Sequence, residues 1–245
     1  MLSDPLFWFV AIPAVLITGI SKSGFAGGAG GLTVPLLALA ISPTAATAVM
    51  LPLLIYMDLL SARSWWGKHS AKQLWILLPS AVLGIVIAYL LFDRLNEQYL
   101  RGILGVVSLG FGLYGLLQGS RLQRQPPPWV GNICGTIAGF TSFVAHAGGP
   151  PLNAYLLPLR LVKTEYLATA VMFFAVVNGA KLIPYSLLGQ INLSNLMVSA
   201  ALAPLAWMGV KLGLRIQDKI DEKHFKQIIL SLMILVGIRL LWTAF

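Results

Sequence analysis

The sequence predicts an all-α polytopic membrane protein built from two inverted repeats, each a re-entrant helical hairpin followed by three transmembrane helices. Composition, the spacing of apolar segments and an internal repeat support this prediction. Of the 245 residues, 58% are hydrophobic and 10% are charged, whereas a soluble domain carries about 25% charged residues. The net charge of +9 is spread over loops, which does not favour a nucleic-acid partner.

Apolar segments alternate with short polar loops along the whole chain. Two of them, 30–41 and 150–159, are too short to cross a core of about 30 Å at about 1.5 Å per residue. Each follows a glycine-rich break, at 24–31 and at 148–151. We therefore expect re-entrant hairpins over 5–41 and 129–159, and membrane spans over 44–62, 73–92, 99–118, 166–187, 195–215 and 223–244.

The two halves of the chain resemble each other. The five residues Ala-Thr-Ala-Val-Met at 46–50 recur at 168–172, and the acidic pair Asp93 and Glu97 recurs as Asp218 and Glu222. Such self-similarity, at offsets of 122 and 125 residues, indicates a structural repeat. We place the N-terminal repeat at 1–125 and the C-terminal repeat at 129–245, joined by three prolines.

The distribution of lysine and arginine predicts how the repeats are oriented. Cytoplasmic loops are enriched in these residues. If both hairpins re-enter and the second repeat is inverted, twelve basic residues face one side and two face the other; if all eight segments cross, the split is nine to five. We therefore expect both termini outside the cytoplasm in the cell membrane. The cytoplasmic set is Arg63, Lys68, Lys72, Arg121, Arg124, Arg160, Lys163, Lys211, Arg215, Lys219, Lys223 and Lys226, against Arg94 and Arg101.

Three features together carry a resemblance to a known family. The run of glycines at 24–31 leading to Pro35, the half-chain repeat and the second break at 148–151 resemble the TauE/SafE family of sulfite exporters and sulfonate-uptake permeases. The resemblance covers nearly the whole chain. It implies a secondary transporter, in the direction of export, for small sulfur-containing anions such as sulfite or organosulfonates, without selecting one substrate.

The hairpin tips are the expected binding site. Discontinuous helices at a repeat interface commonly form transporter sites near the bilayer midplane, and the free N–H groups of helix starts bind oxyanions. The alternative is that the tip glycines serve close helix packing, as we expect for Gly131, Gly135 and Gly139. The candidate substrate-binding residues are Ser21, Lys22, Ser23, Gly30, Gly31, Thr141, Ser142, His146, Gly148, Gly149, Asn153 and Asn178.

Ionisable residues at membrane depth supply the candidates for charge and coupling. Lys22 either compensates the substrate's charge or caps the carbonyl end of helix 5–20. His146 either shuttles a proton or is a neutral packing residue, and Asp58 is the second coupling candidate, with a proton or sodium as the coupling ion. Lys181 is expected to extend outward to the interface.

An intramembrane enzyme acting on a lipid phosphate and an anion channel are the alternative functions. The enzyme would need a buried acid–base constellation, but no glutamate lies inside a predicted span and the two hairpins contain one histidine, His146, so we do not expect an enzyme. The single cysteine, Cys134, cannot build a cysteine metal site, and neither a metal nor a cofactor is expected. The expected partners are a small anion and the lipid bilayer, and a homodimer stays open.

Overall fold

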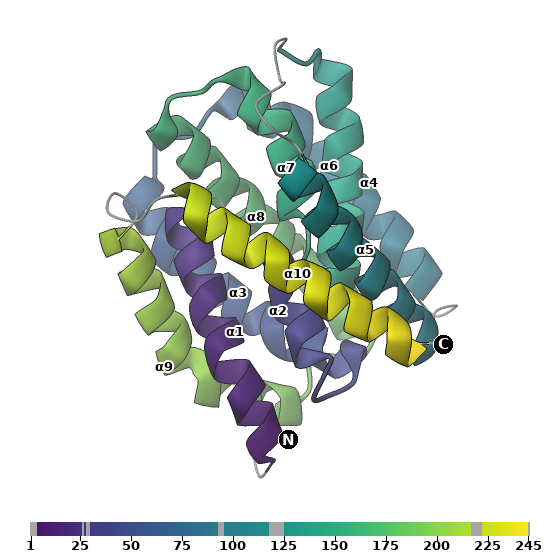
Figure 1. The fold of residues 1–245 in the computed structure, drawn as a ribbon. Helices are drawn as coiled ribbons and strands as arrows, with labels where there is room; N and C mark the ends of the chain where they lie inside the picture. The colour runs from purple at the N-terminus through teal and green to yellow at the C-terminus, as the bar shows by residue number, and fades with distance from the viewer. Residues whose placement is uncertain are drawn as a thin grey trace.

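The computed structural model describes residues 4–25, 27, 30–92, 96–117, 125–216 and 222–244, in which every regular element is helical (Figure 1). This confirms the predicted all-α class. The helices are α1 (Pro5–Gly24), α2 (Gly30–Leu37), α3 (Pro43–Trp65), α4 (Ala71–Phe92), α5 (Glu97–Leu117), α6 (Pro128–Ala145), α7 (Gly149–Leu156), the 3₁₀ turn η1 (Leu157–Leu159), α8 (Lys163–Leu187), α9 (Leu193–Ile216) and α10 (Glu222–Ala244).

Helix starts follow from local sequence. The side chain of Asp4 accepts a hydrogen bond from the backbone N–H of Leu6 at 2.9 Å, and the hydroxyl of Ser42 accepts one from the N–H of Ala45 at 3.3 Å. Proline follows each of these caps, at Pro5 and Pro43. A proline in the first turn costs no needed donor, because the N–H it lacks would have no partner within the helix.

Five helices in the described part of the chain are long and apolar enough to cross a membrane: α1, α3, α4, α8 and α9. The last four coincide with predicted spans, and the protein is a polytopic membrane protein. Large apolar side chains point outward, such as Trp75 at 80% and Ile183 at 70% exposure, as expected for a lipid-facing surface. With 20 residues, α1 is itself long enough to cross, so its part in a re-entrant hairpin stays a prediction.

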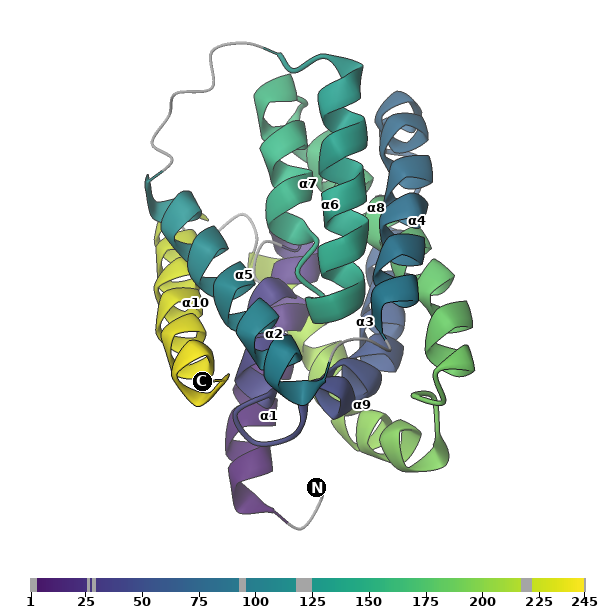
Figure 2. The ribbon, with the colours of Figure 1, turned by 90° about the vertical axis from the view of Figure 1, so that its right-hand side faces the viewer.

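Helices from the two halves pack across each other. The first hairpin helix, α1, packs mainly against α9, and its counterpart α6 packs mainly against α4. Likewise α5 pairs with α10, α3 packs against α8 and α9, and α8 packs against α4. The contacts follow the repeat: when each helix number is shifted by five, the contact of α1 with α9 becomes that of α6 with α4, and the contact of α3 with α9 becomes that of α8 with α4. Figures 1 and 2 show α5 and α10 side by side. The repeat boundaries and inverted orientation stay predictions.

The two hairpin tips meet inside the molecule. We call the end of α1 with the start of α2 the first tip, and the end of α6 with the start of α7 the second tip. In Figure 2 the α6–α7 pair fills the upper part of the molecule, whereas α1 rises from the lower end. A methyl group added at Gly31 would lie 3.2 Å from the Cβ atom of Ala147, so the tips are in direct contact.

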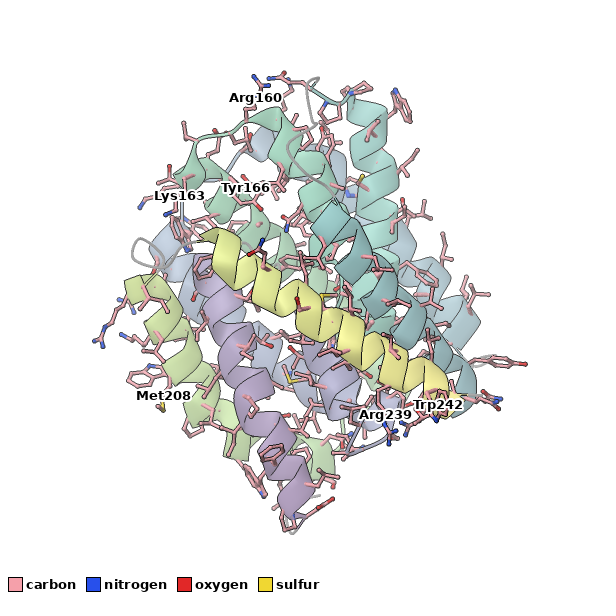
Figure 3. The ribbon with its side chains drawn as sticks, in the orientation of Figure 1. Arg160, Lys163, Tyr166, Met208, Arg239 and Trp242 are labelled. Carbon is pink, nitrogen blue, oxygen red and sulfur yellow. The ribbon has the colours of Figure 1, made fainter. Side chains whose placement is uncertain are left out.

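Charged residues mark opposite ends of the molecule. Figure 3 shows Arg160 and Lys163 toward one end and Arg239 and Trp242 toward the other. The first pair belongs to the predicted cytoplasmic set. The predicted loop residues Arg94, Arg121, Arg124 and Lys219 lie outside the described residues.

Candidate functional site

The buried charges of the described residues lie close to the two tips. Lys22 is 6% exposed, Asp58 is 2% exposed and Lys181 has no exposed surface, and His146 is buried beside them at 6%. They come from α1, α3, α8 and the turn after α6. Ionisable side chains are expensive at membrane depth and are kept there mainly for function, so this region is the candidate site.

The first cluster centres on Asp58. Lys22 Nζ lies 2.6 Å from Asp58 Oδ1, and the Asn178 amide donates to Asp58 Oδ2 at 2.6 Å. Lys22 Nζ also lies 5.2 Å from the centre of the Phe174 ring. The carboxylate thus has a donor on each oxygen and joins α1, α3 and α8. Because Asp58 balances the charge of Lys22, the pair leaves no net charge for a substrate.

The second cluster consists of Lys181, Ser142 and His146. Lys181 Nζ lies 3.0 Å from the Ser142 carbonyl oxygen, 3.0 Å from the Ser142 hydroxyl and 2.8 Å from His146 Nδ1. The expectation that Lys181 extends outward is therefore wrong. The second tip turns back into the helical interior at this point, so acceptors lie within reach of the amine and the side chain does not need to reach the interface.

The contacts of His146 assign its tautomer. Nε2 lies 3.0 Å from the Thr47 carbonyl oxygen, which can only accept, whereas Nδ1 faces the Lys181 amine. Nδ1 also lies 3.1 Å from the Ser142 carbonyl oxygen. A proton on Nε2 satisfies the Thr47 carbonyl and lets Nδ1 accept from Lys181, whereas a proton on Nδ1 alone would leave the Thr47 carbonyl without this donor. The backbone of His146 is left-handed, with φ of 52°. Few residues other than glycine adopt this conformation, and it concentrates at functional positions.

Aromatic residues of α8 form a wall between the tips. A methyl group added at Gly27 would lie 3.0 Å from Cε2 of Phe174, and one added at Gly148 would lie 3.2 Å from Cε1 of the same ring. One turn beyond Lys181, the Tyr185 hydroxyl donates to the Phe143 carbonyl oxygen at 2.7 Å. Glycine at both tips lets the backbone approach this wall closely.

The remaining candidate residues support the tips through their own contacts. The Ser23 hydroxyl donates to the Val210 carbonyl oxygen on α9 at 3.1 Å, and the Thr141 hydroxyl donates to that of Ala147 at 3.1 Å. Asn153 Oδ1 accepts from the Tyr166 hydroxyl at 2.9 Å. Ser21 is buried, and the glycines Gly30 and Gly149 begin α2 and α7 as expected. The structure therefore brings Lys22, Ser142, His146 and Asn178 to the two clusters.

A cavity of about 270 Å³ lies between the first tip, the segment after α7 and the start of α8. Lys163 and Tyr166 line it, and Figure 3 shows both near Arg160. Gly24 and Phe25 of the first tip also line it. The remaining lining residues are Leu156, Leu157, Leu161 and Leu167.

Sequence reasoning missed the roles of Lys181, Phe174 and Thr47. One signal was present for Lys181: it lies six residues before the end of α8, which is about 9 Å of helix, more than a lysine side chain can comfortably span to reach the interface. No sequence signal identifies Thr47, because it contributes only a backbone carbonyl. Phe174 is one apolar residue among many in its helix.

Comparisons of the sequence with known proteins identify a family and a relative. The family described as sulfite exporter TauE/SafE matches residues 11–240. The probable inner membrane transporter protein TsaS of Comamonas testosteroni is 24% identical over 193 residues, which cover 77% of this chain and 81% of that protein. No solved structure matches the chain.

Proposed function

The chain belongs to the sulfite exporter TauE/SafE family, and we propose that it carries small sulfur-containing anions, such as sulfite or an organosulfonate, by alternating access at a site between the two tips. The direction proposed is export. We place the transporter in the inner membrane, with both termini outside the cytoplasm, in line with the charge bias of its loops. A membrane transporter is also what the relative's name describes.

The observation that carries the proposal is the excess of buried positive charge at the tips. Two lysines and one aspartate are buried there, so the described site has a net charge of +1 when both lysines are protonated. A cation buried at membrane depth is stable only with compensation, and a bound anion provides it. Helices α2 and α7 also begin at the tips, and their N–H groups favour an oxyanion.

The packing of the halves supports alternating access. Each hairpin packs on a helix of the other half, α1 on α9 and α6 on α4, so movement of one hairpin with its partner exposes one side of the tips. The cavity lined by Lys163 and Tyr166 is the proposed route from the cytoplasm.

We expect the purified protein in liposomes to exchange sulfite across the membrane. Labelled sulfite should enter faster when unlabelled sulfite is trapped inside, because a loaded carrier returns faster than an empty one. Uptake should saturate with concentration. The measurement is initial uptake of labelled sulfite with and without internal sulfite.

A channel would give flux that does not saturate and is not stimulated by internal sulfite. A lipid phosphatase would release phosphate from a short-chain lipid phosphate and would not move sulfite. Either result would contradict the proposed carrier. Empty liposomes are the control for leak.

A further inference from the structure

We propose that Lys181 is the proton-exchanging residue of the transport cycle: its amine holds a proton while an anion occupies the site and releases it to water when the site is empty. This inference rests on the proposed anion transport. It assigns coupling to a residue that sequence reasoning did not select, in place of His146 and Asp58. One proton then accompanies each monovalent anion.

The first step of the argument is the difference between the two buried lysines. Lys22 forms an ion pair with Asp58 at 2.6 Å. In the part of the chain that the structure describes, no carboxylate lies within 4.0 Å of Lys181 Nζ, whose partners are Ser142 and His146. An ammonium surrounded only by neutral groups is costly when buried, so the empty site favours the neutral amine.

The second step is that the three partners of Lys181 satisfy both protonation states. As an ammonium, Nζ has three N–H groups and three acceptors: the Ser142 carbonyl, the Ser142 hydroxyl and His146 Nδ1. As a neutral amine it donates to the carbonyl and to Nδ1, and its lone pair accepts from the Ser142 hydroxyl. Rotation of one hydroxyl is the only change that these side-chain contacts need between the two protonation states.

The third step excludes the two other candidates. Asp58 has a donor on each carboxylate oxygen, from Lys22 and Asn178, so a proton added to this carboxylate would displace one of the two donors. His146 Nε2 is committed to the Thr47 carbonyl, and a second proton on Nδ1 would compete with the Lys181 amine for the Ser142 carbonyl oxygen, which lies 3.1 Å from Nδ1 and 3.0 Å from Nζ. An ordinary lysine is also far more basic than an ordinary imidazole, so a proton shared by the two resides on Lys181.

The charged and titratable groups around Lys181 are consistent with a site whose net charge is set by the proton on Lys181. Helices α1, α3, α4 and α6 pack against α8. Among their described residues, the only full charges at the tips besides Lys181 are Lys22 and Asp58, which cancel. The titratable groups on these elements and on α8 near the site are Lys22, Asp58, Lys72 (exposed), Tyr89 (half-buried), Cys134 (half-buried), His146 and Tyr185.

Two variants of Lys181 separate binding from proton release. Arginine stays protonated in proteins, so Lys181→Arg should retain sulfite exchange. Net uptake into sulfite-free liposomes should fall by about tenfold or more, because the empty site of this variant cannot become neutral. In the unchanged protein, net uptake should acidify the liposome interior, read by a trapped pH-sensitive dye. Lys211→Arg, on an exposed lysine of α9, is the matched control and should behave like the unchanged protein.

If an arginine side chain does not fit in place of Lys181, the neutral variant Lys181→Gln still tests the proposal. Glutamine supplies no charge, so this variant should fold with an unchanged or higher melting temperature but lose the stabilisation that sulfite gives the unchanged protein. Net uptake by Lys181→Arg at the original rate, or full sulfite stabilisation of Lys181→Gln, would overturn the assignment. If the unchanged protein neither binds nor exchanges sulfite, the proposed substrate class fails instead.

Discussion

Replacing Lys22 by methionine is expected to lower the free energy of unfolding by about 3–5 kcal/mol and to abolish sulfite exchange. Without Lys22, the Asp58 carboxylate keeps only Asn178 as a partner and becomes an unpaired buried charge, which is the costly half of a broken ion pair. Asp58→Leu should be destabilising for the converse reason. The measurements are denaturant unfolding in mixed micelles and exchange in liposomes.

The double variant Lys22→Met with Asp58→Leu distinguishes stability from transport. Replacing both charges by apolar groups of similar size is often neutral for stability, so the double variant should recover most of the loss. Exchange should still be about tenfold or more below the unchanged protein, because the contacts that hold the first tip on α1 against α3 and α8 are gone. A double variant as unstable as the single ones, or one that exchanges normally, would contradict a role for this pair in the site. Arg63→Met, on an exposed residue of α3, is the control.

Gly84→Ala is expected to disrupt the packing of α4 on α6, at a cost of about 3 kcal/mol or more. A methyl group at Gly84 would overlap the Thr136 carbonyl oxygen and lie 2.8 Å from the Phe140 backbone nitrogen. Both obstacles belong to the helix backbone, which cannot move aside as a flexible side chain would. The expected result is a large loss of melting temperature or of the monodisperse folded protein.

Gly179→Ala is the matched control for this packing. It is also a helical glycine, on α8, but a methyl group there would meet nothing within 4 Å. Alanine is the better helix former by about 0.8–1.0 kcal/mol, so this variant should be as stable as the unchanged protein or slightly more. Equal loss of stability in both variants would mean that helix contact at Gly84 is not the cause.

Much of the fold could be predicted because membrane helices follow from length and hydropathy. The expected spans 44–62, 73–92, 166–187 and 195–215 lie within or nearly coincide with α3, α4, α8 and α9, and the short helices α2 and α7 begin at Gly30 and Gly149. These starts follow from the glycine and proline breaks. The packing of α1 on α9 and of α6 on α4 was not predicted, because hydropathy says which segments are apolar but not which partner each one chooses.

The candidate site was predictable in its place but not in its contacts. The tip residues Lys22, Ser142 and His146 were selected from sequence because polar groups at a helix break stand out. The ion pair of Lys22 with Asp58 joins residues 36 positions apart, and the contact of Lys181 with Ser142 spans 39. Only the folded packing of α3 and α8 against the hairpins decides which lysine is neutralised by a carboxylate and which is not.

The most direct test of an anion site between the tips is the melting temperature of the purified protein against a panel of anions. A ligand that binds only the folded state raises the melting temperature by mass action. Sulfite, thiosulfate, sulfoacetate, sulfate, acetate and chloride form the panel, at equal concentration and ionic strength. The expected result is a selective rise with at least one sulfur anion and none with acetate or chloride. Equal shifts with all anions, or none with any of them, would contradict a site for sulfur anions in this protein.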